Sequence, residues 1–354
     1  MQDSPLLRSH EAAGARLSDA AAHLGRVLTY GSVPEEVEAG MNGVLVLDRT
    51  TRGLVSVSGT EAEDFLHRIL ANRIKGLEPG TGNRNLLLTG KGKVVQVFDL
   101  AFLGEGYLLS AETGQGEALR AALDMYLFAE DVAVTDETES YAPLELVGPK
   151  SLKVLGDVLE GAPEVRGEAH AHTLASFGGS AVRVVPVDVA GAEGWRVEAE
   201  PARVPALFEA LLAAGARAGG LVAYDSLRAD RVAGAFGQEI TDDVYPQEAR
   251  LEDAFSLEKG CYIGQEVVAK IDTYGGLNKR LHRLRVSSDD PVPPGTRLVR
   301  EVRGEERDLG VVTSWAYSFE EDGGVVLGYV KRKHQEPGTE FKLEGTGDTA
   351  TLRD

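Results

Sequence analysis

The residues with the clearest capacity for chemistry form one short segment, Lys259-Gly260-Cys261-Tyr262-Ile263-Gly264-Gln265-Glu266. Cys261 is the only cysteine in the chain, and a lysine precedes it by two residues. The apolar spacing that follows the segment predicts a helix beginning near Gly264. A nearby cation and a helix N-terminus both favour the thiolate, so Cys261 is a candidate catalytic residue. The alternative is a small buried apolar side chain, which is the more common use of a lone cysteine.

The composition restricts the kind of site to which this thiol can belong. The chain has 354 residues, of which 43% are hydrophobic and 26% charged, as in two or three globular domains. One cysteine can neither form an intramolecular disulfide nor hold an iron–sulfur cluster alone, and the seven histidines show no ligand spacing. We therefore expect no resident metal. We also expect a cytoplasmic location and no membrane partner, because the sequence shows neither a leader nor a long apolar run.

The charge pattern argues against direct binding of nucleic acid. The 37 basic and 56 acidic residues give a net charge of -19, which repels phosphate backbones. Residues 259–285 depart from this average, with six basic and two acidic side chains, a local excess of +4. This stretch is either a solvated face or a cationic wall for an anionic ligand.

Helical and strand periodicities alternate along the chain, which predicts an α+β protein. An amphipathic helix is expected over residues 11–24, and Thr60 is expected to cap a second helix through a capping box. Residues 182–198 are expected to form a β-hairpin, and residues 220–231 a helix that carries Tyr224 and Arg228. After Arg280 the pattern changes to five short β segments, which predicts a small barrel or sandwich.

The segment around Cys261 resembles the signature of the YgfZ-type folate-binding proteins, relatives of the glycine-cleavage T protein, an aminomethyltransferase. Further motifs occur in the order of that superfamily along nearly the whole chain. They are Thr89-Gly90-Lys91-Gly92-Lys93, Leu227-Arg228-Ala229-Asp230, Gly237-Gln238-Glu239, Tyr245-Pro246-Gln247-Glu248-Ala249, Gly310-Val311-Val312-Thr313-Ser314 and Gly328-Tyr329-Val330.

The resemblance implies a three-domain ring of the aminomethyltransferase folate-binding type. Residues 1–50 and 137–278 would form a discontinuous folate-binding α+β core, and residues 51–136 an inserted α+β domain. Residues 279–354 would form a small C-terminal β-barrel.

The resemblance also implies a cofactor, tetrahydrofolate or a one-carbon derivative of it. Asp230 stands in the place of the superfamily's pterin-binding glutamate, and a carboxylate can accept hydrogen bonds from pterin N–H groups. Lys259 stands at a cationic folate contact. Tyr224, Arg228 and Trp195 are further candidates for folate binding, with packing in the core as the alternative.

The family is associated with folate-dependent maintenance of iron–sulfur enzymes, including tRNA-modifying ones. The resemblance therefore implies iron–sulfur client or assembly proteins as partners, and it leaves open whether a reaction is catalysed. One alternative is the aminomethyltransferase of the glycine cleavage system. The T protein has an acidic pair after its Lys-Gly turn, whereas this chain has Val95-Gln96-Val97, so the amine chemistry would lose its carboxylate. The other alternative is a non-catalytic scaffold that folate stabilises.

Overall fold

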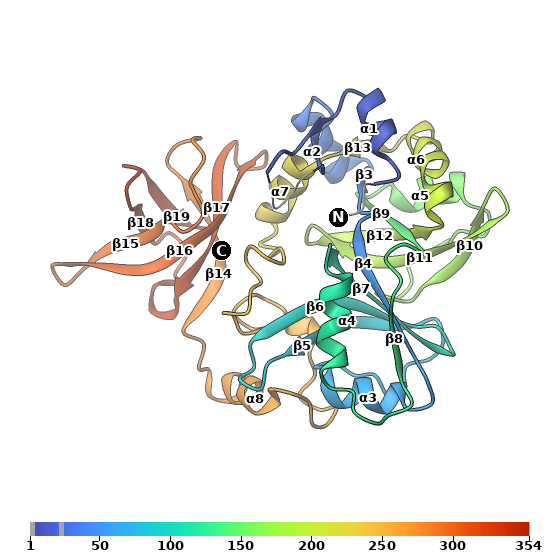
Figure 1. The fold of residues 1–354 in the computed structure, drawn as a ribbon. Helices are drawn as coiled ribbons and strands as arrows, with labels where there is room; N and C mark the ends of the chain where they lie inside the picture. Colours follow the sequence, from blue (N-terminus) through green and yellow to red (C-terminus); the bar gives the residue numbers. More distant parts are fainter. Residues whose placement is uncertain (1–3, 21–24, 354) are drawn as a thin grey trace. The chain divides into compact units, whose positions relative to one another are not determined.

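The computed structural model describes residues 4–20 and 25–353, in which helices and strands alternate along the chain (Figure 1). The chain forms two compact units. The first consists of Met1–Leu87, Gln96–Tyr224 and Ala254–Tyr262, and the second of Leu88–Val95, Asp225–Asp253 and Ile263–Asp354. The α+β class is confirmed. The division into three domains stays a prediction.

A six-stranded sheet forms the main core of the first unit, in the order β10-β11-β12-β9-β3-β13. Its pairs are antiparallel except β3 with β13, which are parallel. Helices α5 (Ser151–Val158) and α6 (Val204–Ala213) contribute apolar side chains to the same core cluster. The expected hairpin over 182–198 is confirmed as β11 and β12. The strands are β3 (Leu45–Asp48), β9 (Ala142–Val147), β10 (Thr173–Phe177), β11 (Ser180–Val189), β12 (Ala192–Ala199) and β13 (Arg217–Gly219).

A second sheet has five strands in the order β5-β6-β7-β4-β8, with helices α3 (Ala62–Ile69) and α4 (Gly116–Asp124) between its strands in sequence. The expected capping box at Thr60 is wrong. The Thr60 hydroxyl donates to Asp131 Oδ2 at 2.6 Å, and the N-cap position of α3 is Glu61, which makes no side-chain cap hydrogen bond. The strands are β4 (Arg52–Ser58), β5 (Gly82–Leu88), β6 (Val94–Phe102), β7 (Gly106–Thr113) and β8 (Ala133–Asp136).

The N-terminal segment differs from the sequence expectation. Helix α1 (Leu7–Ala12) stops before Gly14, whose φ of 70° is left-handed. The chain then forms β1 (Arg16–Leu17), which pairs with β2 (Val27–Thr29), so the helix expected over 11–24 is wrong where it is described. Residues 21–24 lie outside the described residues. Helix α2 (Val33–Asn42) follows β2.

The second unit contains a closed barrel in the order β14-β17-β16-β15-β18-β19 (orange to red in Figure 1). The predicted C-terminal barrel is therefore confirmed. The sequence missed β19, a four-residue strand whose partners β14 and β18 close the barrel. The strands are β14 (Lys279–Val286), β15 (Arg297–Val302), β16 (Glu305–Ser318), β17 (Gly323–Lys331), β18 (Glu340–Leu343) and β19 (Thr349–Leu352).

Two further helices carry the sequence motifs. Helix α7 (Leu221–Asp230) contains Tyr224 and Arg228, and α8 (Gln265–Tyr274) begins directly after Gly264, as predicted. None of the helices in the described part of the chain is long and apolar enough to cross a membrane.

Candidate functional site

Two reciprocal hydrogen bonds between Lys259 and His67 attach the residues just before Cys261 to helix α3. Lys259 is only 9% exposed, and its Nζ donates to the His67 carbonyl at the end of α3. In return, His67 Nε2 lies 3.0 Å from the Lys259 carbonyl oxygen. The Cys261 side chain is exposed. The thiol is therefore exposed to solvent, whereas the lysine two residues before it is buried and hydrogen-bonded.

The hydrogen bonds around His67 define its protonation. The backbone N–H groups of Ile74 and Lys75 point at His67 Nδ1 over 3.4 and 3.3 Å, so Nδ1 is the acceptor. The proton is then on Nε2, which donates to the Lys259 carbonyl. Burial and the Lys259 charge lower the pKa of His67, which favours this neutral form. Sequence reasoning missed His67, because a single histidine on an amphipathic helix carries no signal for a partner far along the chain.

Burial lowers the pKa of Lys259 to about 8, and the nearby Cys261 partly opposes that shift. The Lys259 ammonium lies 5.2 Å from the centre of the Tyr262 ring. Burial also raises the pKa of Tyr262 to about 12, and its hydroxyl has no hydrogen-bond partner among the described residues. Lys259 can therefore exchange a proton close to neutral pH beside the exposed thiol.

The second glycine of the motif has a packing role within the second unit. Gly264 has a φ of 81°, and a Cβ there would lie 2.5 Å from the Thr89 carbonyl oxygen and 2.9 Å from Gly92 Cα. A Cβ at Gly92 would lie 3.1 Å from Val267 Cβ. The turn at 89–93 and the start of α8 thus pack backbone against backbone, which only glycine permits.

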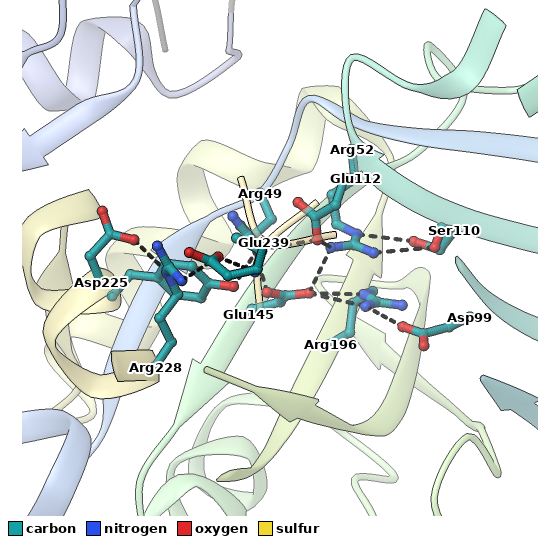
Figure 2. Close-up of polar contacts among 12 residues, drawn as sticks. Arg49, Arg52, Asp99, Ser110, Glu112, Glu145, Arg196, Asp225, Arg228 and Glu239 are labelled. Atoms are coloured by element: carbon teal, nitrogen blue, oxygen red, sulfur yellow. Dashed lines mark hydrogen bonds and ion pairs between the residues drawn. The ribbon is translucent and has the colours of Figure 1, made fainter. Parts of the chain in front are cut away.

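Arg228 on α7 forms a buried ion pair (Figure 2). The side chain is 2% exposed, and its Nη1 donates to Glu239 Oε2 at 2.8 Å, while Nη2 donates to Gln238 Oε1 at 2.6 Å. Glu239 also accepts a hydrogen bond from Ser314 of the barrel at 2.7 Å. Two of the superfamily motifs therefore contact each other, and removing either partner of the ion pair would leave the other charge buried and unpaired.

Asp230 ends α7 and faces Arg283 of β14. Arg283 Nη1 lies 3.1 Å from the Asp230 carbonyl oxygen and 3.4 Å from its Oδ1. Burial raises the pKa of Asp230, against the opposing effects of Ser318 and Arg283. The carboxylate is thus partly desolvated and already has a cationic partner. The pterin contact of Asp230 stays a prediction.

The aromatic candidates occupy different environments within the first unit. Trp195 on β12 is 4% exposed and packs in the main core, with the Arg166 guanidinium 5.5 Å from its ring. Tyr224 is half-buried beneath Arg49, whose Cζ lies 4.7 Å from the ring centre. Tyr224 also lines a cavity of about 230 Å³, which Trp195 does not.

Arg49 belongs to a network of buried charges (Figure 2). Arg49 Nε donates to Glu145 Oε2 at 2.9 Å, and Arg196 Nη2 lies 3.0 Å from Glu145 Oε1 and 2.6 Å from Asp99 Oδ2. Arg52 pairs with Glu112 at 2.9 Å.

The arginines keep the three carboxylates of this network ionised. Burial alone would raise the pKa of Asp99, but Arg196 leads the charges that lower it below its ordinary value. The same balance lowers the pKa of Glu112, through Arg49 and Arg52, and that of Glu145. The sequence shows only that charged residues interrupt apolar strands, and it does not show which of them meet.

Gln96 lies on β6, shortly after the 89–93 turn. The side chain is buried, and its Nε2 donates to Gln115 Oε1 at 3.2 Å. The Oε1 atom of Gln96 has no hydrogen-bond partner among the described residues. An amide that can accept one more hydrogen bond therefore occupies this position, without a negative charge.

The predicted site residues fall into separate groups. Lys259 and Cys261 share one segment of the first unit, which also contains Tyr224 and Trp195. Arg228 and Asp230 belong to the second unit. Within residues 4–20 and 25–353, no group of histidine, cysteine or acidic side chains could hold a metal ion.

Two family models match the chain. Residues 6–259 match the GCVT N-terminal domain, and residues 279–353 match the glycine cleavage T-protein C-terminal barrel domain.

Individual proteins agree with the family models. A protein of Arabidopsis thaliana named "Putative transferase At1g60990, chloroplastic" is 30% identical over 315 residues, covering 87% of this chain and 70% of the relative. An aminomethyltransferase of Rubrobacter xylanophilus is 29% identical over 331 residues, covering 93% of this chain and 87% of the relative. A solved structure is also similar, the crystal structure of glycine cleavage system aminomethyltransferase T from Bartonella henselae. Its TM-score is 0.85 at 25% sequence identity, covering 100% of this chain and 97% of that chain. The expected fold type is thereby confirmed.

Proposed function

Because the chain belongs to the glycine cleavage T-protein family, we propose that it binds a reduced folate and supports the assembly, repair or activity of iron–sulfur enzymes. Within this family we place it in the YgfZ-type branch, whose signature its Cys261 segment resembles. The folate would be tetrahydrofolate or a one-carbon derivative, and the partners would be iron–sulfur proteins, including tRNA-modifying ones.

The observation that carries the proposal is the exposed thiol of Cys261 on a segment fixed by Lys259 and His67. A buried cysteine would be a packing residue, whereas an exposed thiol beside a lysine is available to a partner. One thiol cannot hold a cluster alone, so any ligation would be transient or shared with a second protein.

Asp230, Lys259 and Tyr224 are the folate contacts of the proposal. Arg228 and Trp195 are further folate-binding candidates, with packing in the core as the alternative, since both side chains are almost fully buried. Aminomethyl transfer is the less favoured alternative, because the buried amide of Gln96 cannot supply the charge of a carboxylate.

The test of folate binding is calorimetry with tetrahydrofolate and its formyl and methylene forms. Loss of the Asp230 carboxylate should cost about 1.5–3 kcal/mol, or roughly 10- to 150-fold in affinity. The matched control is Asp272→Ala on α8, which removes an exposed carboxylate. Equal affinities for Asp230→Ala and wild type would refute the pterin contact.

The same preparation should be tested for catalysis. We expect no methylenetetrahydrofolate from tetrahydrofolate and an aminomethylated lipoyl carrier protein. Turnover in that assay would replace the proposed function with the aminomethyltransferase alternative. Folate binding without any effect of folate-site variants on iron–sulfur client enzymes would instead favour the scaffold.

A further inference from the structure

The cavity beside Tyr224 is not explained by the motif around Cys261. Its volume of about 230 Å³ is below the roughly 300–1,000 Å³ of sites for drug-sized ligands. It therefore suits a small molecule. The wall includes residues from the end of β3, the end of β7 and the start of α7. Besides Tyr224, its polar residues are Ser4, Arg26, Asp48, Arg49, Thr51 and Thr113.

Arg49 leaves one donor of its guanidinium unused on this wall. The residue is 4% exposed, with Nε bonded to Glu145 and Nη2 to the Tyr224 hydroxyl at 3.4 Å. Its Nη1 makes no hydrogen bond to any residue within 4–20 and 25–353. Glu145 and Glu112 balance the charge of Arg49 at 2.9 and 3.6 Å, and the N–H groups of Nη1 can donate to an acceptor in the cavity.

Two hydroxyl groups of the wall are also available. The side chains of Thr51 and Thr113 line the cavity, and neither hydroxyl is hydrogen-bonded to another residue in the described part of the chain.

The acidic group of the wall is already satisfied. Asp48 Oδ2 accepts from the Ser4 hydroxyl at 2.5 Å and from His10 Nε2 at 2.8 Å. Its Oδ1 accepts from the Thr50 backbone N–H at 2.8 Å and from the Thr50 hydroxyl at 2.7 Å. The cavity thus offers unused donors, whereas its carboxylate is occupied.

The cavity wall itself carries two arginines and one carboxylate. Arg26 and Arg49 are the cationic residues of the wall, and Asp48 is its acidic residue. The fully buried Glu36 lies next to the wall, where its Oε2 accepts from the backbone N–H of the lining residue Gly220 at 3.0 Å. The two guanidinium groups are therefore the part of the wall that suits an anion.

We infer that this cavity binds a small oxyanion, a carboxylate or a phosphate group, between Arg26 and Arg49, with the Thr51 and Thr113 hydroxyls as further donors. Guanidinium groups suit both kinds of anion, because their planar forks match carboxylate and phosphate oxygens. The inference goes beyond the proposed function and does not require folate or the Cys261 thiol.

Titration calorimetry of the full chain with glutarate and with inorganic phosphate tests the site, with chloride at the same ionic strength as the reference. We expect millimolar or tighter binding of at least one probe. Arg26→Ala should weaken it about tenfold, since a charged hydrogen bond contributes on the order of 1.5 kcal/mol. Arg16→Ala is the matched control, because it removes an exposed arginine of the neighbouring strand β1 and should leave the affinity unchanged.

A second variant removes donors without changing the charge. Thr51→Val combined with Thr113→Val keeps the side-chain volumes, and we expect it to weaken binding about five- to thirtyfold, the effect of two neutral hydrogen bonds. Circular dichroism would verify that each variant folds. Tighter binding of phosphate or of glutarate would assign the kind of anion. No binding of either probe to the wild type, or equal affinities in Arg26→Ala and Arg16→Ala, would overturn the inference.

Discussion

The backbone contact at Gly264 makes a sharp prediction about the motif that contains Cys261. Replacing Gly264 with alanine introduces a Cβ at a position where the chain has a φ of 81°. That Cβ would lie 2.5 Å from the Thr89 carbonyl oxygen and 2.9 Å from Gly92 Cα. Both obstacles are backbone atoms, so neither can rotate away as a flexible side chain would.

The expected cost has two parts. A left-handed backbone conformation costs a residue with a Cβ about 1–2 kcal/mol. Overpacking that displaces a neighbouring segment adds about 1–3 kcal/mol. The free energy of unfolding of Gly264→Ala should therefore fall by about 2–5 kcal/mol in total.

Gly275, which ends the same helix, is the matched control. Its φ is 64°, but a Cβ there would meet only the Arg332 guanidinium, at 3.5 Å, which can move. The free energy of unfolding of Gly275→Ala should therefore fall only by the cost of the left-handed backbone conformation, about 1–2 kcal/mol. Urea unfolding, followed by fluorescence and circular dichroism, measures both variants. Equal losses in the two variants would refute the close contact between the 89–93 turn and α8.

Two further predictions concern the thiol and the buried charges. Cys261→Ser should leave the fold and folate affinity near those of the wild type, because the side chain is exposed, yet it should lower the activity of iron–sulfur clients in cells lacking the native protein. A native thiol that resists alkylation until unfolding would contradict this reasoning. In the network, the pKa values of Asp99, Glu112 and Glu145 are lowered, so at acidic pH the unfolded chain binds more protons than the folded one. The contribution of the three carboxylates to the free energy of unfolding is therefore complete above about pH 5, and it is lost as the pH falls through the folded pKa values. Urea midpoints should therefore fall with acidification below about pH 4, and the fall should be smaller in Glu145→Gln, which should itself lose about 3–5 kcal/mol at neutral pH.

Local periodicity was sufficient for much of the fold. The β11–β12 hairpin and most of the barrel strands alternate apolar and polar side chains, and that pattern depends only on near neighbours in sequence. The failures have distant partners. Residues 16–17 form a strand with β2 instead of the expected helix, and Thr60 bonds to Asp131, 71 positions away, while Glu61 occupies the N-cap of α3.

The candidate site was less predictable, for the same physical reason. Arg49 and Glu145 are 96 positions apart in the sequence, and His67 and Lys259 are 192 positions apart. No spacing rule connects such pairs. A sequence can show that charged residues interrupt apolar strands, which signals a buried network. It cannot show that Arg49 of this network also lines a cavity.

The structure separates packing from chemistry within the motif that contains Cys261. Gly264 is required by its contact with the 89–93 turn, and Lys259 is engaged by the His67 carbonyl. Neither explanation extends to Cys261, whose side chain is exposed. An exposed thiol contributes little to the free energy of unfolding, so the packing of the fold does not require a cysteine there. A loss of activity in Cys261→Ser at unchanged stability would consequently be a loss of thiol chemistry, whereas Gly264→Ala would lose activity only together with stability.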